Sequence, residues 1–135
     1  MQPRGIRNNN PLNIRVGCKW VGEVENPTDK DFKQFTCMHY GLRAGFILLR
    51  RYIERYHLCT ITDILSRWAP NRENNTRKYI EYVCDFACIG ALDKISFQDA
   101  DTMIAIVDAM CNYENGTRVP LNVIQEGYAL ACELN

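Results

Sequence analysis

The feature that most constrains the fold is a helical repeat of apolar residues from Tyr40 to Tyr56. Leu42, Phe46, Leu49, Ile53 and Tyr56 recur there at steps of three and four residues, so we expect them to lie along one face of an α-helix. The opposite face carries mainly arginines. The segment therefore predicts an amphipathic helix.

Helical signals recur through the rest of the chain. Thr60 is a good N-cap for a helix over about 60–68, which a proline then stops. Further apolar periods predict helices over about 74–88, 96–116 and 120–135. Glycines follow two of these segments, and a proline stands at the start of the last one, as is typical of helix ends and helix starts.

One short segment has the pattern of a strand instead. Asp31 to Phe35 alternates polar and apolar residues, and we expect it to pair with Trp20 to Glu25 across a loop that contains Asn26 and Pro27. The predicted fold class is therefore mainly α, with some α+β character. It has about five helices and one small β-hairpin near the N-terminus.

Length and charge set the organisation of the chain. A sequence of 135 residues, of which 47% are hydrophobic, has the size of a single domain, 1–135, with one core. The 16 basic and 16 acidic residues cancel, which argues against nucleic acid as a partner. No apolar run approaches the ~20 residues of a membrane span. The start lacks the pattern of a signal peptide, so we expect synthesis in the bacterial cytoplasm without one.

Seven cysteines are many for this length, and their odd number leaves one thiol outside any intramolecular pairing. Because no Cys-x-x-Cys pair or other ligand cluster is present, we predict no metal site and no cofactor. Without a secretion signal, we expect the thiols to be reduced. Cys84, Cys88, Cys111 and Cys132 fall in predicted helices, where we expect them to be buried as small apolar filler.

The opening segment, Arg4 to Arg15, is too polar for a core, since it holds four asparagines and three arginines. Asparagine side chains hydrogen-bond the backbone in tight turns, and Pro11 biases Asn10 away from the helical region. The same amides would read sugar hydroxyls or peptide groups if they faced outward. The sequence leaves both roles open for Asn10 and Asn13.

Six motifs in this order resemble a family of small phage and prophage proteins, which are commonly described as virion structural proteins or lysozyme-like proteins. The motifs are RGIRNNNPLNIR (4–15), FxxF (32–35), YGLRA (40–44), WAP (68–70), ENxTxxYI (73–80) and AMxxxExG (109–116). They cover nearly the whole chain. The resemblance implies a lysozyme-like domain of phage or phage-derived origin.

The opening segment also resembles the asparagine-rich turn of glucosaminidases and lytic transglycosylases, which follows a helix that carries the acid glutamate. Only nine residues precede Asn10 here, too few for such a helix. The helix that ends in Tyr113-Glu114-Asn115-Gly116 is similar to the acid-bearing helix, but it lies near the other end of the sequence. A circular permutation would bring the two together, because domain termini often lie close in space. On this resemblance, Glu114 is the candidate general acid.

A general acid protonates the glycosidic oxygen as it leaves, and apolar or aromatic surroundings favour the protonated form of its carboxyl group. Tyr113, Trp20, Tyr40 and Trp68 are candidates for these surroundings and for a surface on which sugar rings stack. The structural alternative is that Glu114 is a solvated residue at the end of a helix.

Glu73 is the second candidate carboxylate. It belongs to the ENxT motif, although capping and the helix dipole also explain an acidic residue near a helix start. Glu23, Glu25 and Asp31 on the predicted hairpin are further candidates. The distance between the second carboxylate and Glu114 would bear on a retaining or an inverting reaction.

The two resemblances together imply an enzyme that cleaves the glycan strands of peptidoglycan, as a muramidase, glucosaminidase or lytic transglycosylase. The alternative is a non-catalytic virion structural or cell-wall-binding protein with the same fold. We expect peptidoglycan and phage virion or contractile-secretion components as partners, with action at the cell wall or periplasm or carriage in a virion. The predicted catalytic residues are Glu114 and Glu73, and the predicted substrate-binding residues are Asn10, Asn13, Tyr40, Trp68, Thr76 and Tyr113.

Overall fold

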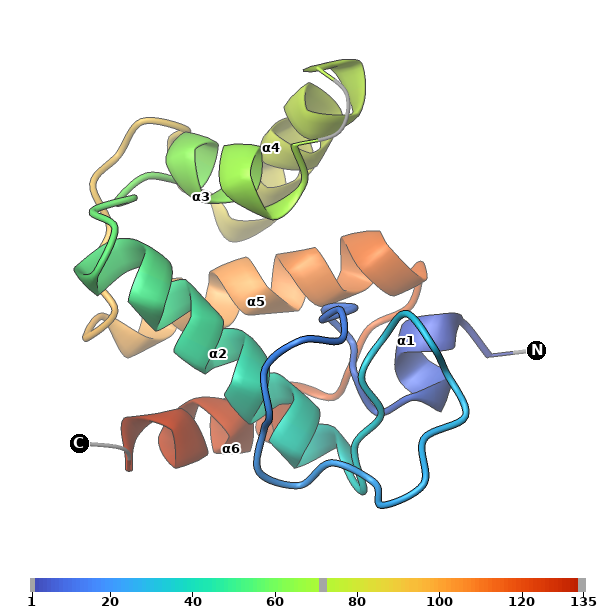
Figure 1. Ribbon diagram of the computed structural model, residues 1–135. Coiled ribbons are helices and arrows are strands. Elements are labelled where there is room, and N and C mark those ends of the chain that lie inside the picture. Colours follow the sequence, from blue (N-terminus) through green and yellow to red (C-terminus); the bar gives the residue numbers. More distant parts are fainter. Residues whose placement is uncertain (1, 71–72, 134–135) are drawn as a thin grey trace.

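The computed structural model describes residues 2–70 and 73–133, and the side chains of residues 73 and 74 lie outside this description. Its regular structure is helical (Figure 1). The helices are α1 (Arg4–Arg7), α2 (Met38–Glu54), α3 (Ile61–Trp68), α4 (Glu73–Ala87), α5 (Ala100–Asn115) and α6 (Leu121–Cys132). The mainly α fold class is confirmed, and α2 to α6 correspond to the five predicted helices.

Besides α5, which begins at Ala100 rather than at about residue 96, two helices differ from the sequence prediction. α1 is absent from it, because four residues are too few to show a helical period. α2 ends at Glu54 rather than at Tyr56. His57 then takes a left-handed conformation with φ +57°, and the N–H of Leu58 bonds back to the carbonyl of Tyr52 at 2.9 Å.

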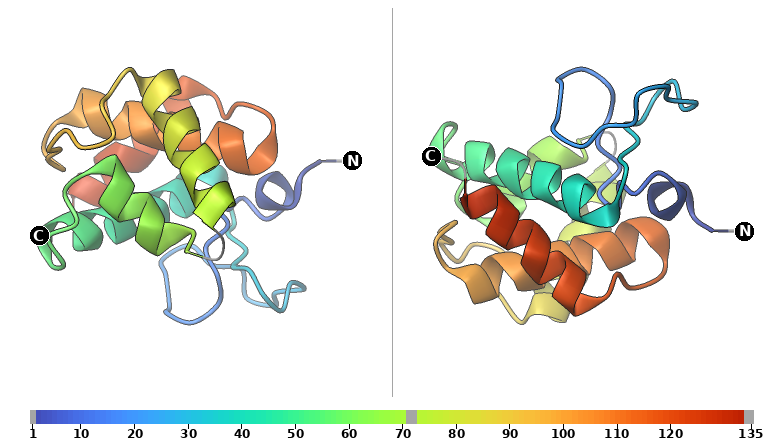
Figure 2. Two further views of the ribbon diagram at one scale, coloured as in Figure 1. Left: turned by 90° about the horizontal axis from the view of Figure 1, so that it is seen from above. Right: turned by 90° about the horizontal axis from the view of Figure 1, so that it is seen from below.

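The helical body, α2 to α6, encloses the main apolar core. α2 packs along α6, and α4 packs along α5 (Figures 1 and 2). Of the apolar face predicted for α2, Leu42, Phe46, Leu49 and Ile53 are buried, whereas Tyr56 lies beyond the end of the helix and is 45% exposed. The ring of Phe46 meets Tyr128 of α6 edge-on with centroids 5.3 Å apart. Among the described helices, none combines the length and the apolar character needed to cross a membrane.

The N-terminal segment, residues 4–37, is built differently. Its described residues form no named strand, and the predicted hairpin is reduced to two isolated antiparallel bridges, Arg15 with Phe32 and Glu23 with Phe35. The bridges keep the two arms of the segment side by side. Side chains supply much of the remaining hydrogen bonding.

Asn10 is the clearest example of this side-chain bonding, because it is fully buried. Its Nδ2 donates to the carbonyls of Ile14 at 2.9 Å and Lys33 at 3.0 Å. Its Oδ1 accepts from the N–H of Ile14 at 3.0 Å. One amide thus ties a turn to the opposite arm, where a sheet would use backbone groups.

Two glycines allow the N-terminal segment to lie against the helical body (Figure 2). A Cβ on Gly41 of α2 would lie 1.9 Å from the carbonyl oxygen of Asn9, and a Cβ on Gly5 would lie 2.4 Å from Oδ1 of Asn115. Leu12 is 1% exposed and anchors the segment in the main core. The glycines of the RGIRNNNP and YGLRA motifs therefore have a packing role.

All seven cysteines are free thiols. Cys111 is fully buried, as predicted for apolar filler, and burial raises the pKa of its thiol well above the usual value. Cys88 and Cys132 are exposed, so the prediction that they are buried is wrong. Cys88 lies just beyond α4 with φ +57°, and Cys132 is the last residue of α6, where neither is covered by another helix.

Candidate active site

Glu114 lies beside the asparagine-rich turn of the N-terminal segment. Its Oε1 accepts a hydrogen bond of 3.0 Å from Nδ2 of Asn13, across a separation of 101 positions. The next residue, Asn115, donates from Nδ2 to the carbonyl of Pro11 at 2.8 Å. The end of α5 and the asparagine-rich turn therefore meet, which is the juxtaposition that the proposed permutation requires.

The local backbone explains this position. Gly116 ends α5 with φ +68°, and its N–H bonds to the carbonyl of Asn112 at 2.8 Å. Glu114 thus lies half-buried in the last helical turn, where the helix dipole disfavours a negative charge. The amide of Asn13, itself in a left-handed conformation with φ +53°, offsets that effect by donating to the carboxyl group.

An aromatic cluster borders Glu114 on the side of α4. Tyr79 and Tyr113 stack with ring centroids 4.1 Å apart and an interplanar angle of 20°, and Tyr82 lies 5.3 Å from Tyr113. Burial, together with the nearby negative charge of Glu114, raises the pKa of Tyr79 well above its usual value. The phenol of Tyr79 is therefore harder to ionise than that of an exposed tyrosine.

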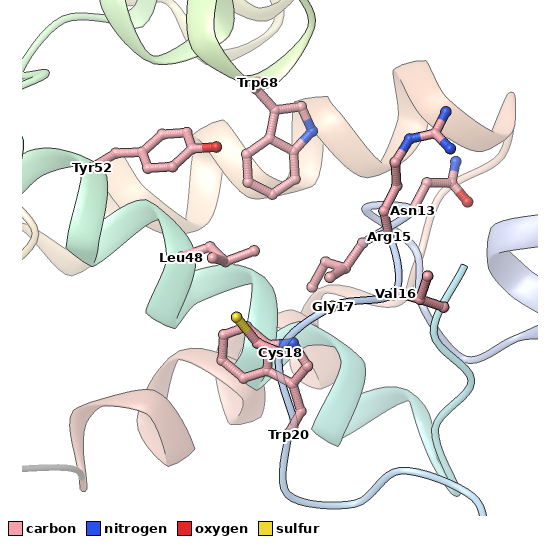
Figure 3. Close-up of a pocket in the computed structure, with 10 residues that line it drawn as sticks. Asn13, Arg15, Val16, Gly17, Cys18, Trp20, Leu48, Tyr52 and Trp68 are labelled. Carbon is pink, nitrogen blue, oxygen red and sulfur yellow. The ribbon is translucent and has the colours of Figure 1, made fainter. Parts of the chain in front are cut away.

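A groove of about 300 Å³ begins at Asn13 and runs between the opening loop, α2 and the end of α3 (Figure 3). Trp68 and Tyr52 form one wall, with centroids 5.9 Å apart in an edge-to-face arrangement. The lining residues are Asn13, Ile14, Arg15, Val16, Gly17, Cys18, Trp20, Leu48, Tyr52 and Trp68. Glu114 is not itself a lining residue, and Asn13 is the residue that connects it to the groove, because Asn13 lines the groove and donates to the Glu114 carboxyl group.

The structure places three predicted substrate-binding residues at this site. Asn13 and Trp68 line the groove, and Tyr113 belongs to the cluster beside Glu114. Trp20, the other tryptophan of the chain, also lines the groove.

The other predicted substrate-binding residues have structural contacts. Asn10 is buried and uses its amide on backbone groups, which is the turn-forming role. Tyr40 packs against Gly22 and a small second core. The Thr76 hydroxyl donates to the carbonyl of Ala69 and thereby links the end of α3 to α4.

None of the candidate second carboxylates has a described contact with Glu114. Glu73 is the first residue of α4, but its side chain lies outside the described residues. Glu23 pairs with Lys33 at 2.9 Å and accepts from the N–H of Trp20 at 2.6 Å, so it braces the loop that carries Trp20. Glu25 and Asp31 are exposed on the N-terminal segment.

Sequence reasoning missed seven of the ten groove residues, among them Arg15, Leu48 and Tyr52. Leu48 and Tyr52 are four positions apart on α2, at the edge of its apolar face, and that spacing is the available signal. Over the described part of the chain, no three histidine, cysteine or carboxylate side chains gather as a metal site would require.

No family model matches the chain. The chain is similar to a protein called P5 from Pseudoalteromonas phage PM2. The two are 41% identical over 118 residues, which cover 84% of this chain and 72% of the relative.

Proposed function

The chain belongs to the family of protein P5 of Pseudoalteromonas phage PM2, and we propose that it cleaves the glycan strands of peptidoglycan with Glu114 as the general acid. The observation that carries this proposal is the hydrogen bond between Asn13 and Glu114. It joins a half-buried carboxyl group to the loop that lines an aromatic groove.

The contact with Asn13 suits a group that delivers a proton. An amide Nδ2 can only donate, so it fixes Oε1 as the acceptor and leaves Oε2 to carry the acidic proton. When that proton passes to the leaving glycosidic oxygen, the carboxylate that remains keeps the amide donor at Oε1. The same hydrogen bond then becomes charge-assisted and therefore stronger.

The groove suits a sugar chain. Trp68 and Trp20 offer amphipathic ring surfaces, and Tyr52 adds a hydroxyl group at the same wall. A largely apolar cleft with a few convergent polar groups is the usual form of a small-ligand site. Its position next to Asn13 would align a bound glycan with the carboxyl group.

The test is a cleavage assay on purified peptidoglycan with mass spectrometry of the soluble products. Glu114→Gln keeps the size of the side chain and an acceptor for Asn13 but removes the acid, so we expect a loss of about 100-fold or more. Glu81→Gln, an exposed glutamate on α4, is the matched control and should cleave like the wild type. A 1,6-anhydro product would identify a lytic transglycosylase, and the reducing-end sugar would separate a muramidase from a glucosaminidase.

Two results would count against the proposal. Full activity of Glu114→Gln would remove Glu114 from the reaction. Wild-type protein that binds peptidoglycan but releases no product at any pH between about 4 and about 9, which spans the pKa values of catalytic carboxyl groups, would favour the non-catalytic cell-wall-binding protein. Glu73→Gln and Glu23→Gln in the same assay test the second carboxylate.

A further inference from the structure

Arg15 lies at the rim of the groove and has an unusual setting. It is exposed, and its guanidinium carbon lies 4.7 Å from the centroid of the Phe32 ring. Among the described residues, it makes no hydrogen bond or ion pair. The guanidinium is thus held by an aromatic ring and keeps its donor groups available.

Arg4 gives a direct comparison on the same ring. Its guanidinium carbon lies 4.4 Å from the Phe32 centroid, but its Nε and Nη2 each donate to Asp29 at 2.7 Å. Its charge is therefore neutralised within the N-terminal segment. The equivalent charge of Arg15 has no such partner in the described chain.

The charge of Arg15 lies in an otherwise uncharged groove lining. Of the described residues that line the groove, Arg15 is the one with a formal charge, and the others are apolar or neutral polar groups. The guanidinium of Arg15 and the amide of Asn13 extend from the same loop on the same side of the groove (Figure 3). A ligand in the groove that contacts Asn13, the hydrogen-bond partner of Glu114, therefore lies near one cation.

We infer that Arg15 binds a carboxylate of the substrate, so that the groove selects acidic, muramic-acid-containing glycan over neutral polymers of N-acetylglucosamine such as chitin. The inference rests on the proposed function and specifies its substrate class. A guanidinium recognises a carboxylate through two parallel N–H donors, which a lysine or a neutral amide cannot reproduce. The carboxylate belongs either to the stem peptide or to the lactyl group that is free when the peptide is removed.

Binding separates this inference from catalysis. Pull-down isotherms would use three insoluble glycans: intact peptidoglycan, peptidoglycan stripped of its peptides by an amidase, and chitin. The wild type should bind at least one acidic glycan more tightly than chitin. Arg15→Gln should weaken binding to that glycan about tenfold, the loss of one charge-assisted pair, and leave chitin unchanged.

Arg55→Gln is the matched control, because Arg55 is an exposed arginine just after α2 and away from the groove lining. It should bind like the wild type on all three glycans. An equal loss on acidic glycan and chitin, or no preference in the wild type, would overturn the role of Arg15. Since binding is measured without cleavage, the effect of Arg15→Gln on binding can be interpreted even if Glu114 is not the general acid. Loss on intact or on stripped glycan alone identifies which carboxylate is bound.

Discussion

The helical body and the N-terminal segment are held together by different forces. In the body, Phe46 and Leu49 are fully buried by other apolar side chains. In the segment, Asn10 is equally buried, but it is held by three hydrogen bonds to backbone groups. An apolar core accepts side chains of similar volume, whereas a buried amide with all its groups engaged has no simple replacement.

This difference matters because Glu114 lies where the two regions meet. The body fixes the carboxyl group at the end of α5, and the segment supplies Asn13 and one wall of the groove. Damage to the polar segment should therefore reach the site more directly than similar damage to the distant core. The following predictions test that contrast.

The largest effect is expected for Asn10→Ala. The substitution removes three hydrogen bonds and leaves the N–H of Ile14 and the carbonyl of Lys33 without their partner, whereas the carbonyl of Ile14 still accepts from the N–H of Lys33. We therefore expect a loss of about 3 kcal/mol in the free energy of unfolding. Urea denaturation would measure it. Leu49→Ala in the body should cost a similar amount, about 2–5 kcal/mol.

The two variants should differ in activity under conditions where both remain folded. Asn10→Ala should weaken cleavage because the loop that holds Asn13 loses its support, and Leu49→Ala should leave cleavage nearly unchanged. A loss of less than about 1 kcal/mol for Asn10→Ala, the value of one ordinary hydrogen bond, would contradict the claim that the hydrogen bonds of Asn10 hold the N-terminal segment in place.

Gly41→Ala tests the contact between the two regions. A Cβ at this position would lie 1.9 Å from the carbonyl oxygen of Asn9, a backbone atom that cannot rotate away. We expect a destabilisation of about 1–3 kcal/mol from overpacking, although alanine favours the helix more than glycine does. Thermal unfolding followed by circular dichroism would measure the change.

Gly45→Ala is the matched control on the same helix, with the same gain in helix propensity. Its Cβ would lie 2.4 Å from Cδ1 of Leu12, the end of a flexible side chain that can move. We therefore expect a smaller loss than for Gly41→Ala. Equal losses would show that the backbone contact with Asn9 does not limit how closely the segment packs.

The contrast between apolar packing in the helical body and side-chain hydrogen bonding in the N-terminal segment also explains which parts of the fold the sequence predicts. Helices α2 to α6 follow from apolar periodicity, because each buries one face. The hairpin is not found as strands, since amides such as that of Asn10 form bonds that leave no period in the sequence. Only Cys111 of the four cysteines predicted as filler is fully buried, because burial near helix ends depends on neighbouring helices.

The candidate site also has features that the sequence predicts and features that depend on the path of the chain in space. The approach of Glu114 to Asn13 follows from the family resemblance, and no spacing within the chain could have revealed a contact across 101 positions. Trp68, a candidate for sugar stacking because of its aromatic character, lines the groove. Tyr40 has the same character, yet it packs against Gly22, a contact that depends on the path of the loop.

The smallest effect is expected at Asp29, the main ionic contact of the N-terminal segment. Its carboxylate accepts two hydrogen bonds from Arg4 at 2.7 Å and one from Asn8 at 2.9 Å. Above all the bonds from Arg4, and then the bond from Asn8, hold the pKa of Asp29 well below its usual range. A lowered pKa in the folded state means that the stabilisation is present above the unfolded value of about 4 and is lost as the pH falls below it.

Asp29→Asn should therefore flatten the acid dependence of stability. Between pH 7 and pH 3, a drop of about four units that crosses the unfolded pKa, the wild type should lose more free energy of unfolding than the variant. Asp31→Asn is the control, because Asp31 is 64% exposed and its oxygen lies 3.5 Å from Arg4, so its curve should parallel that of the wild type. Arg4 is itself 44% exposed, so solvent and salt screen the pair and keep the effect small.

Hydrogen exchange at low pH would show where that loss occurs. Protonation of Asp29 should open the N-terminal segment first, so the N–H groups of Ile14 and Lys33 should lose protection while those of α5 keep it. In Asp29→Asn, the segment should already exchange faster at pH 7. Simultaneous loss of protection in both regions would mean that the N-terminal segment and the helical body unfold as one unit. The two regions would then differ in the kind of bonds that hold them but not in local stability.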